Sequence, residues 1–195
     1  MELSLGASRN CICDCDPRDF CDLSNCLRSI TSIVIHGDGQ DVDLSAIPAE
    51  AFGKAMAKIK DISVRYCDLT TEQYTSVFTE LKRATPTIVE RLELSRGPSF
   101  DDELMEVDAV LMGKALSRVK TVDVSGAKLT GEQYVKIVEE SSAEEPMIVQ
   151  ELHLPECGAV LTDVGEEVLD KALTNIKIYC NGSRVKGYRY SYGGR

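Results

Sequence analysis

The sequence is poor in the residues and motifs on which most catalytic and cofactor-binding sites depend. It has only two histidines, His36 and His153. It contains no glycine-rich phosphate loop, no calcium-binding loop, and no serine–histidine–aspartate or histidine–cysteine arrangement. Because no clustered acid–base group is visible, the sequence predicts no catalytic residue, no cofactor and no enzyme activity.

Long apolar runs and positive charge are also scarce. No run approaches the roughly 18 apolar residues of a membrane-spanning helix, so no membrane partner is expected. The 195 residues carry a net charge of −10, which repels phosphates and argues against a nucleic-acid ligand. The first ten residues, MELSLGASRN, lack the basic and apolar regions of a signal peptide. These features predict a cytoplasmic protein, or an extracellular one if a leader has been removed.

Cysteine, by contrast, is abundant, and five of the eight cysteines fall within residues 11–26. The five are Cys11, Cys13, Cys15, Cys21 and Cys26. They are compatible with a disulfide-stapled cap, with a zinc site of four thiolates, or with reduced thiols on a cap or loose tail. No CxxC pair is present, so no metal site is predicted and these residues are its weak candidates.

A stretch of the chain occurs twice at an offset of sixty residues. Between residues 53–74 and 113–134, ten of 22 aligned positions are identical, including the run Leu-Thr-x-Glu-Gln-Tyr. Each thirty-residue half of the unit also carries the pattern apolar-x-x-apolar-x-apolar, whose period of two is typical of a strand. The six predicted strands are centred on Ile30/Ile33/Ile35, Ile59/Ile62/Val64, Val89/Leu92/Leu94, Val119/Val122/Val124, Val149/Leu152/Leu154 and Leu173/Ile176/Ile178.

Helical patterns of two alternating kinds lie between these strands. The first kind covers residues 47–59, 107–119 and 164–176, and the second covers 70–81 and 130–141. In the second kind, Thr70 and Thr130 stand three residues before Gln73 and Gln133, an arrangement that predicts a capping box at each helix start. A strand followed by a helix every thirty residues predicts a parallel repeat architecture.

The segments 119–129 (VKTVDVSGAKL) and 59–69 (IKDISVRYCDL) match the pattern LxxLxLxx(N/C)xL. On these residues the chain resembles the leucine-rich repeat family, in its long ribonuclease-inhibitor-like class, over roughly residues 29–181. The resemblance implies an α/β solenoid, with a curved parallel sheet of about six strands on the concave side and helices on the convex side. Residues 1–28 would then be a cysteine-rich cap or flexible segment, and 182–195 a basic, tyrosine-rich tail.

In such a solenoid, alternate strand residues line the concave face of the sheet. That face is the predicted binding surface for a protein partner of unknown identity, and the alternative is a merely solvated sheet face. The chain would act as a non-enzymatic interaction module, as a monomer or a homodimer. The predicted contact residues are His36, Ser63, Arg65, Glu93, Ser95, Asp123, Ser125, His153, Lys177 and Tyr179. The alternative function is a metal- or redox-responsive protein that uses the N-terminal cysteines.

The resemblance also places Cys67, Cys157 and Asn181 at an inward position after a strand, where the family's side chains bond loop backbone groups. Cys67 and Cys157 are therefore expected to be buried rather than nucleophilic. Asn181 also begins an Asn-Gly-Ser glycosylation triplet. We favour the inward position, in which its amide could not carry a sugar. The tail after this triplet could contact RNA or an acidic partner, cover the last strand, or be disordered.

Overall fold

The computed structural model describes residues 2–6, 31–36, 42–65, 67–84, 88–95, 103–143, 147–155 and 163–185. Its main feature is an eight-stranded sheet in the order β1-β2-β4-β6-β7-β8-β9-β10. The strands are β1 (Glu2–Gly6), β2 (Ser32–His36), β4 (Asp61–Arg65), β6 (Arg91–Ser95), β7 (Thr121–Gly126), β8 (Glu151–Leu154), β9 (Lys177–Cys180) and β10 (Ser183–Arg184). Seven neighbouring strands run parallel, and only β10 pairs antiparallel, with β9.

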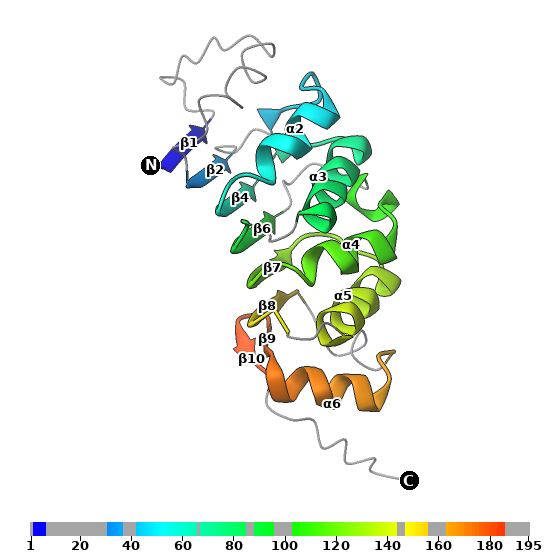
Figure 1. Ribbon diagram of the computed structural model, residues 1–195. Coiled ribbons are helices and arrows are strands. Elements are labelled where there is room, and N and C mark those ends of the chain that lie inside the picture. The colour runs from blue at the N-terminus through cyan, green and yellow to red at the C-terminus, as the bar shows by residue number, and fades with distance from the viewer. Residues whose placement is uncertain are drawn as a thin grey trace.

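Helices cover one face of this sheet (Figure 1). They are α2 (Ala49–Met56), α3 (Thr71–Arg83), α4 (Ala109–Leu116), α5 (Gly131–Ala143) and α6 (Glu166–Asn175), with a short 3-10 helix η2 (Glu103–Glu106). The strands follow one another in chain order, and the helices form a second row beside them (Figure 1). The structure is therefore α/β, with two layers and a mostly parallel sheet.

The sheet contains more strands than the sequence predicted. Five of the six predicted strands appear at their expected places. The sixth, β9, is shifted by two residues, so that Ile178 rather than Ile176 pairs with Leu152, because Leu173 and Ile176 belong to α6 and its end. Two strands are additional: β1 lies within the predicted N-terminal segment, and β10 within the predicted tail. A separate two-stranded sheet joins β3 (Val42–Asp43) to β5 (Cys67–Asp68).

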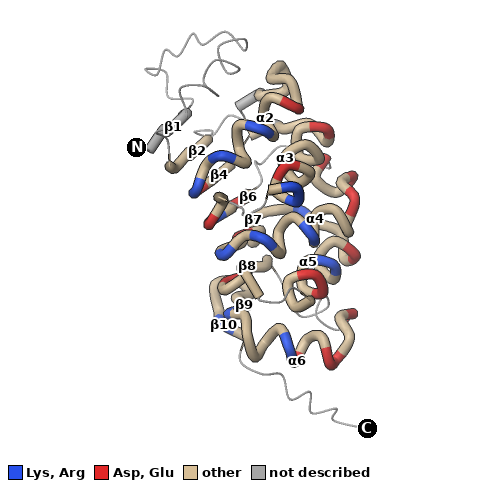
Figure 2. Tube along the Cα trace, viewed as in Figure 1, with Lys and Arg blue, Asp and Glu red and all other residues tan. Residues whose placement is uncertain are grey.

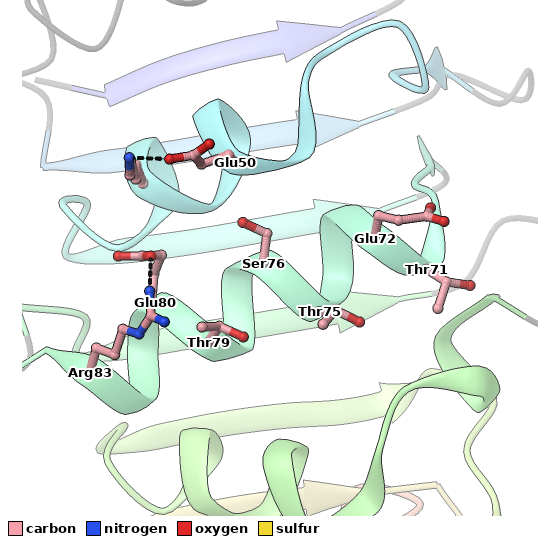
Figure 3. A pocket seen from close by; sticks show the side chains of 9 residues that line it. Glu50, Thr71, Glu72, Thr75, Ser76, Thr79, Glu80 and Arg83 are labelled. Atoms are coloured by element: carbon pink, nitrogen blue, oxygen red, sulfur yellow. Dashed lines mark hydrogen bonds and ion pairs between the residues drawn. The ribbon is translucent and has the colours of Figure 1, made fainter.

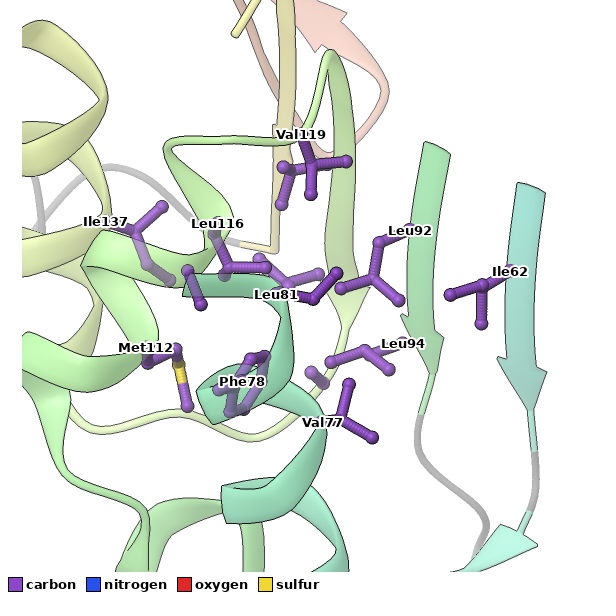
Figure 4. Close-up of a cluster of buried hydrophobic side chains, with 14 of the residues drawn as sticks. Ile62, Val77, Phe78, Leu81, Leu92, Leu94, Met112, Leu116, Val119 and Ile137 are labelled. Atoms are coloured by element: carbon purple, nitrogen blue, oxygen red, sulfur yellow. The ribbon is translucent and has the colours of Figure 1, made fainter. Parts of the chain in front are cut away.

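The strand register explains the thirty-residue period. In each neighbouring pair, apolar residues face apolar residues, so that Leu92 pairs with both Ile62 and Val122. One complete row across the sheet is Ile33, Ile62, Leu92, Val122, Leu152 and Ile178. All six side chains are at most 2% exposed, and each contributes about 1.5–3 kcal/mol by burial. The core lies between this row and the helices, as Figure 4 shows for Leu92, Phe78 and Leu116.

The sixty-residue period has its own physical cause in the helix layer. Thr70 accepts from the Gln73 backbone N–H, and Gln73 Oε1 accepts from the Thr70 backbone N–H. The same box recurs at Thr130 and Gln133, so both predicted capping boxes are confirmed. Both glutamines are 1% exposed, because their Nε2 groups also bond to carbonyls of the loop that precedes α2 or α4.

Repeated glycines allow the helices to pack closely. A Cβ on Gly53 in α2 would lie 2.7 Å from the Ser76 carbonyl carbon in α3, and one on Gly113 in α4 would lie 2.7 Å from the Lys136 carbonyl oxygen in α5. Real Cβ atoms do not approach other atoms so closely, so a side chain at either position would push the helices apart. Gly53 and Gly113 occupy equivalent places in the sixty-residue unit, which explains why both are glycine.

Candidate functional site: the outer face of the sheet

The outer face of the sheet is the face that no described helix covers (Figure 1). Strand residues alternate between this face and the core, so Ser63 and Arg65 are partly exposed while Ile62 and Val64 are buried. We refer to this surface as the outer face. Nine of the ten predicted contact residues have described side chains, and all nine lie on this face: Ser63, Arg65, Glu93, Ser95, Asp123, Ser125, His153, Lys177 and Tyr179. His36 ends β2, and its side chain is outside the described part.

Glu93 is the centre of a charged cluster on β4 and β6. Arg65 Nη2 lies 2.6 Å from one carboxylate oxygen of Glu93 and 2.7 Å from the other. Ser63 Oγ donates to the same carboxylate at 3.2 Å, and Arg91 Nη2 lies 3.6 Å from it. Glu93 is only 8% exposed as a result, so a partner would meet the two arginines rather than this carboxylate.

A hollow of about 290 Å³ lies beside this cluster. Its walls come from β2, β4 and β6, and include Val34, Asp61, Arg65 and Arg91. Ser63 lies between Val34 and Glu93 in the register, and its small side chain leaves this space open. Asp61 and Arg91 were not singled out from the sequence, although each stands two residues before a predicted contact residue on the same face.

A second cluster lies on β8 and β9. The rings of His153 and Tyr179 stack with their centroids 4.5 Å apart and their planes 9° from parallel. Lys177 Nζ donates to Glu151 Oε1 at 2.8 Å, and His153 Nε2 lies 4.0 Å from the other oxygen of Glu151. The hydrogen bond from Lys177 holds the pKa of Glu151 below its ordinary value, and the same bond raises the pKa of Lys177.

Asp123 lies between these two clusters, on β7. Its Oδ1 accepts hydrogen bonds from the Ser125 hydroxyl at 2.6 Å and from the Ser125 backbone N–H at 3.0 Å. Among the described residues no lysine or arginine forms an ion pair with Asp123, unlike Glu93 and Glu151. Asp123 therefore lies near the middle of the outer face, and no ion pair among the described residues holds its carboxylate in place, in contrast to those of Glu93 and Glu151.

A larger groove, of about 490 Å³, lies on the opposite side of the molecule between α2 and α3. Figure 3 shows its lining, which includes Thr71, Thr75, Ser76 and Thr79 on α3. Four of its five charged side chains pair within their own helices, Lys54 with Glu50 and Arg83 with Glu80 (Figure 3), and the fifth is Glu72. Such pairs between exposed residues contribute little to stability.

Charged residues of both signs occur in both layers. Figure 2 shows basic and acidic residues in both the strand row and the helix row, without a large area of one sign. At the start of the strands, Glu90 lies 3.3 Å from Lys60 and 3.2 Å from Lys120, which ties three successive strand starts together. These two lysines hold the pKa of Glu90 below its ordinary value by hydrogen bonding.

The two histidines are far apart, as the sequence indicated. His36 is on β2 and His153 on β8, with β4, β6 and β7 between them. At about 4.8 Å per strand, four steps separate the two backbones by roughly 19 Å. Within the described ranges no group of three or more histidine, cysteine, aspartate or glutamate side chains could hold a metal ion.

The predicted cysteine roles are only partly covered by the described residues. Cys67 is 5% exposed, and its Sγ donates to the carbonyls of Arg65 at 3.1 Å and Ile35 at 3.6 Å, so its predicted inward position is confirmed. Cys180 is disulfide-bonded. Cys157 and the five predicted N-terminal candidates, Cys11, Cys13, Cys15, Cys21 and Cys26, lie outside the described residues.

The inward position predicted for Asn181 is wrong. Asn181 is exposed and occupies a turn with φ 47°, followed by Gly182 with φ 73°. Its backbone N–H donates to the Pro155 carbonyl at 2.9 Å. The chain reverses here into β10 instead of continuing into another repeat, and this reversal turns the Asn181 side chain out to solvent. An Asn-Gly pair at a strand end was the sequence signal for such a hairpin.

Comparison with known proteins found no matching family model, no matching curated protein and no matching solved structure. In the part of the chain that the structure describes, no helix is both long and apolar enough to cross a membrane.

Proposed function

We propose that the chain is a leucine-rich-repeat-like solenoid that acts as a non-enzymatic interaction module and binds a protein partner on its outer face. The observation that carries the proposal is an outer face of parallel strands that no described helix covers, on which described polar and aromatic side chains of β4 to β9 stand in register. The consecutive strand order, the inward Cys67 and the repeated helix packing support the family resemblance.

The size of the outer face suits a peptide or a small protein surface. Seven strands about 4.8 Å apart span roughly 29 Å, and five residues of strand extend about 16 Å. This area of roughly 460 Å² is smaller than the about 800 Å² that a stable interface takes from each partner, so a partner would cover the whole face and also contact residues around its edge. The stacked His153 and Tyr179 rings lie near one end of it and provide aromatic area of the kind enriched in interface centres.

The structure also shows which residues should be changed to test the proposal. Arg65 is a poor choice, because its replacement by glutamate would place a second carboxylate beside the buried Glu93. Asp123 is a better one, because Asp123→Lys reverses a charge without breaking an ion pair among the described residues. Asp170→Lys makes the same charge change on the exposed side of α6 and provides a matched control.

The test is affinity capture from native lysate with the wild-type chain and these two variants, after circular dichroism has shown that all three are folded. We expect a specific protein to be retained by the wild type and by Asp170→Lys, and lost with Asp123→Lys. Equal capture by all three chains, or loss only with Asp170→Lys, would place the binding surface elsewhere.

A further inference from the structure

The turn between β9 and β10 places an asparagine directly before a glycine in an exposed position. Asn181 and Gly182 both have positive φ angles, 47° and 73°, and both are exposed. The flanking residues Cys180 and Ser183 pair across the hairpin, so the turn has only two residues. Asparagine followed by glycine is favoured in such turns, because both tolerate the left-handed conformation.

We propose that Asn181 is a site of spontaneous deamidation. The backbone nitrogen of Gly182 loses its proton and bonds to the side-chain carbonyl carbon of Asn181, and the bond from that carbon to Nδ2 breaks and releases ammonia. Water then opens the resulting succinimide at either carbonyl, giving aspartate or isoaspartate. Gly182 has no Cβ to hinder the attack, and no atom of the described residues lies within 4 Å of the place where a Cβ would be.

The reaction requires a rotation of the Asn181 backbone, and the local structure opposes it only weakly. β10 is two residues long and lies at the end of the sheet order. Its pairing with β9 joins Ser183 to Cys180 and Arg184 to Tyr179. Two further bonds run from the Val185 N–H to the Ile178 carbonyl at 2.8 Å and from the Asn181 N–H to the Pro155 carbonyl at 2.9 Å. The disulfide of Cys180 holds β9, and not β10, in place. Short pairings at a sheet edge open at a small fraction of the free energy of global unfolding.

Isoaspartate at this position has a structural consequence. Its extra main-chain methylene cannot be accommodated in a two-residue turn, so β10 separates from β9. The backbone groups of β9 that β10 covers then face solvent, and an uncovered strand edge is a template for pairing with another chain. The deamidated chain is thus the form in which this end of the sheet is open.

Asn175 provides an internal comparison on the same chain. It is also exposed, but it ends α6, its Nδ2 donates to the Lys171 carbonyl at 2.8 Å, and the next residue is the buried, β-branched Ile176. Both the helical backbone and the Ile176 side chain obstruct attack by the following nitrogen. Trypsin separates the two sites, because Asn175 falls in residues 172–177 and Asn181 in residues 178–184.

The experiment is incubation of the purified full chain at neutral pH and 37 °C, followed by reduction and alkylation, tryptic digestion and mass spectrometry. The reduction step is needed because Cys180, in the 178–184 peptide, is disulfide-bonded. We expect the 178–184 peptide to acquire the mass of the acid and to split into two isomers, one of which is methylated by an isoaspartyl methyltransferase. The 172–177 peptide should keep its mass. Conversion of 178–184 no faster than that of 172–177 would overturn the proposal.

A variant tests the consequence for the hairpin. Asn181→Gly keeps a residue that adopts positive φ but removes the reactive amide. We expect ageing to speed hydrogen exchange at the Val185 amide in the wild type and to leave it unchanged in Asn181→Gly. Equal protection of Val185 in fresh and deamidated wild type would show that β10 stays paired and would overturn the structural part of the proposal.

Discussion

Gln133 Nε2 donates a hydrogen bond of 2.8 Å to the backbone carbonyl of Val107, 26 residues earlier. The same nitrogen reaches the Leu104 carbonyl at 2.9 Å, while the Gln133 backbone N–H and Oε1 complete the cap with Thr130. One buried amide therefore starts α5 and holds the loop before α4. Gln73 does the same for α3 and the loop before α2, through the carbonyls of Leu44 and Ile47.

Replacement of this amide by an apolar group should destabilise the chain strongly. Gln133→Leu leaves two buried carbonyls without their donor, and each costs about 1–3 kcal/mol. We expect the free energy of unfolding in urea to fall by about 3 kcal/mol. The neighbouring exposed Glu132 is the control, because Glu132→Gln should change stability by no more than about 0.5 kcal/mol. A similar small effect for Gln133→Leu would contradict the role given to its side chain.

Two glycines of the second repeat should respond to alanine in opposite directions. Gly113→Ala places a Cβ 2.7 Å from the Lys136 carbonyl oxygen and should cost about 1–3 kcal/mol, because α4 and α5 must separate. Gly131→Ala, at the start of α5, meets no atom within 4 Å in the described part of the chain. It should stabilise the fold by about 0.4–1 kcal/mol, because it restricts the unfolded chain. Thermal unfolding of both variants measures the difference, and equal shifts would contradict the close helix packing.

Burial raises the pKa of Tyr134 to about 12, from an ordinary value of 10.0. The neutral phenol donates to the Ala127 carbonyl at 3.4 Å, and the folded state favours this neutral form. Its contribution to stability is therefore fully present below the ordinary pKa and is lost as the pH rises through about 12. The ultraviolet titration of the wild type minus that of Tyr134→Phe should show one phenol with this raised midpoint. A difference curve centred near 10 would show that the hydroxyl is solvated.

The ion pair of Glu151 and Lys177 should contribute to stability only above acidic pH. The pKa of Glu151 is lower in the folded chain than its ordinary value, mainly because of the hydrogen bond from Lys177. The contribution is present above the ordinary pKa and is lost as the pH falls through the lower, folded value. Lys177→Met should therefore lower the free energy of unfolding at pH 7 more than at pH 3, as measured in urea. The same decrease at both pH values would argue against this pair.

The repeated strands and helices could be predicted because their sequence signals are local and periodic. The triplet Val119, Val122 and Val124 indicated a strand by its spacing, and Thr130 with Gln133 indicated a helix start by its capping box. Both signals act within a few residues, and the packing of each unit against the next reinforces them.

The ends of the sheet could not be predicted in the same way. β1 follows the thirty-residue period, since Leu3 pairs with Ile33 and Leu5 with Ile35, but the first apolar position of the triplet would fall before Met1, so the full pattern was not recognised there. At the other end, the position of Asn181 in the repeat suggested an inward side chain, but the following Gly182 favours a hairpin. Local turn chemistry overrode the family pattern, because the chain turns back at Asn181 and Gly182 and pairs β10 with β9.

The sequence predicted which residues lie on the outer face, but it did not predict which of their side chains contact one another. Strand alternation was enough to place Arg65, Glu93 and His153 on one face. It could not show that Glu93 is buried beneath Arg65 and Arg91, or that His153 stacks on Tyr179, because these contacts depend on which strands are neighbours and on side-chain rotamers.

The most direct test of partner binding on the outer face is site-specific photo-crosslinking in cells. A photoreactive amino acid replaces either Ser125, exposed on β7, or Glu167, exposed on α6. We predict that the chain labelled at residue 125 forms one defined crosslinked product with a protein partner, and that Asp123→Lys abolishes it. A product formed equally from residue 167, or one that survives Asp123→Lys, would contradict the assignment of the outer face as the binding surface.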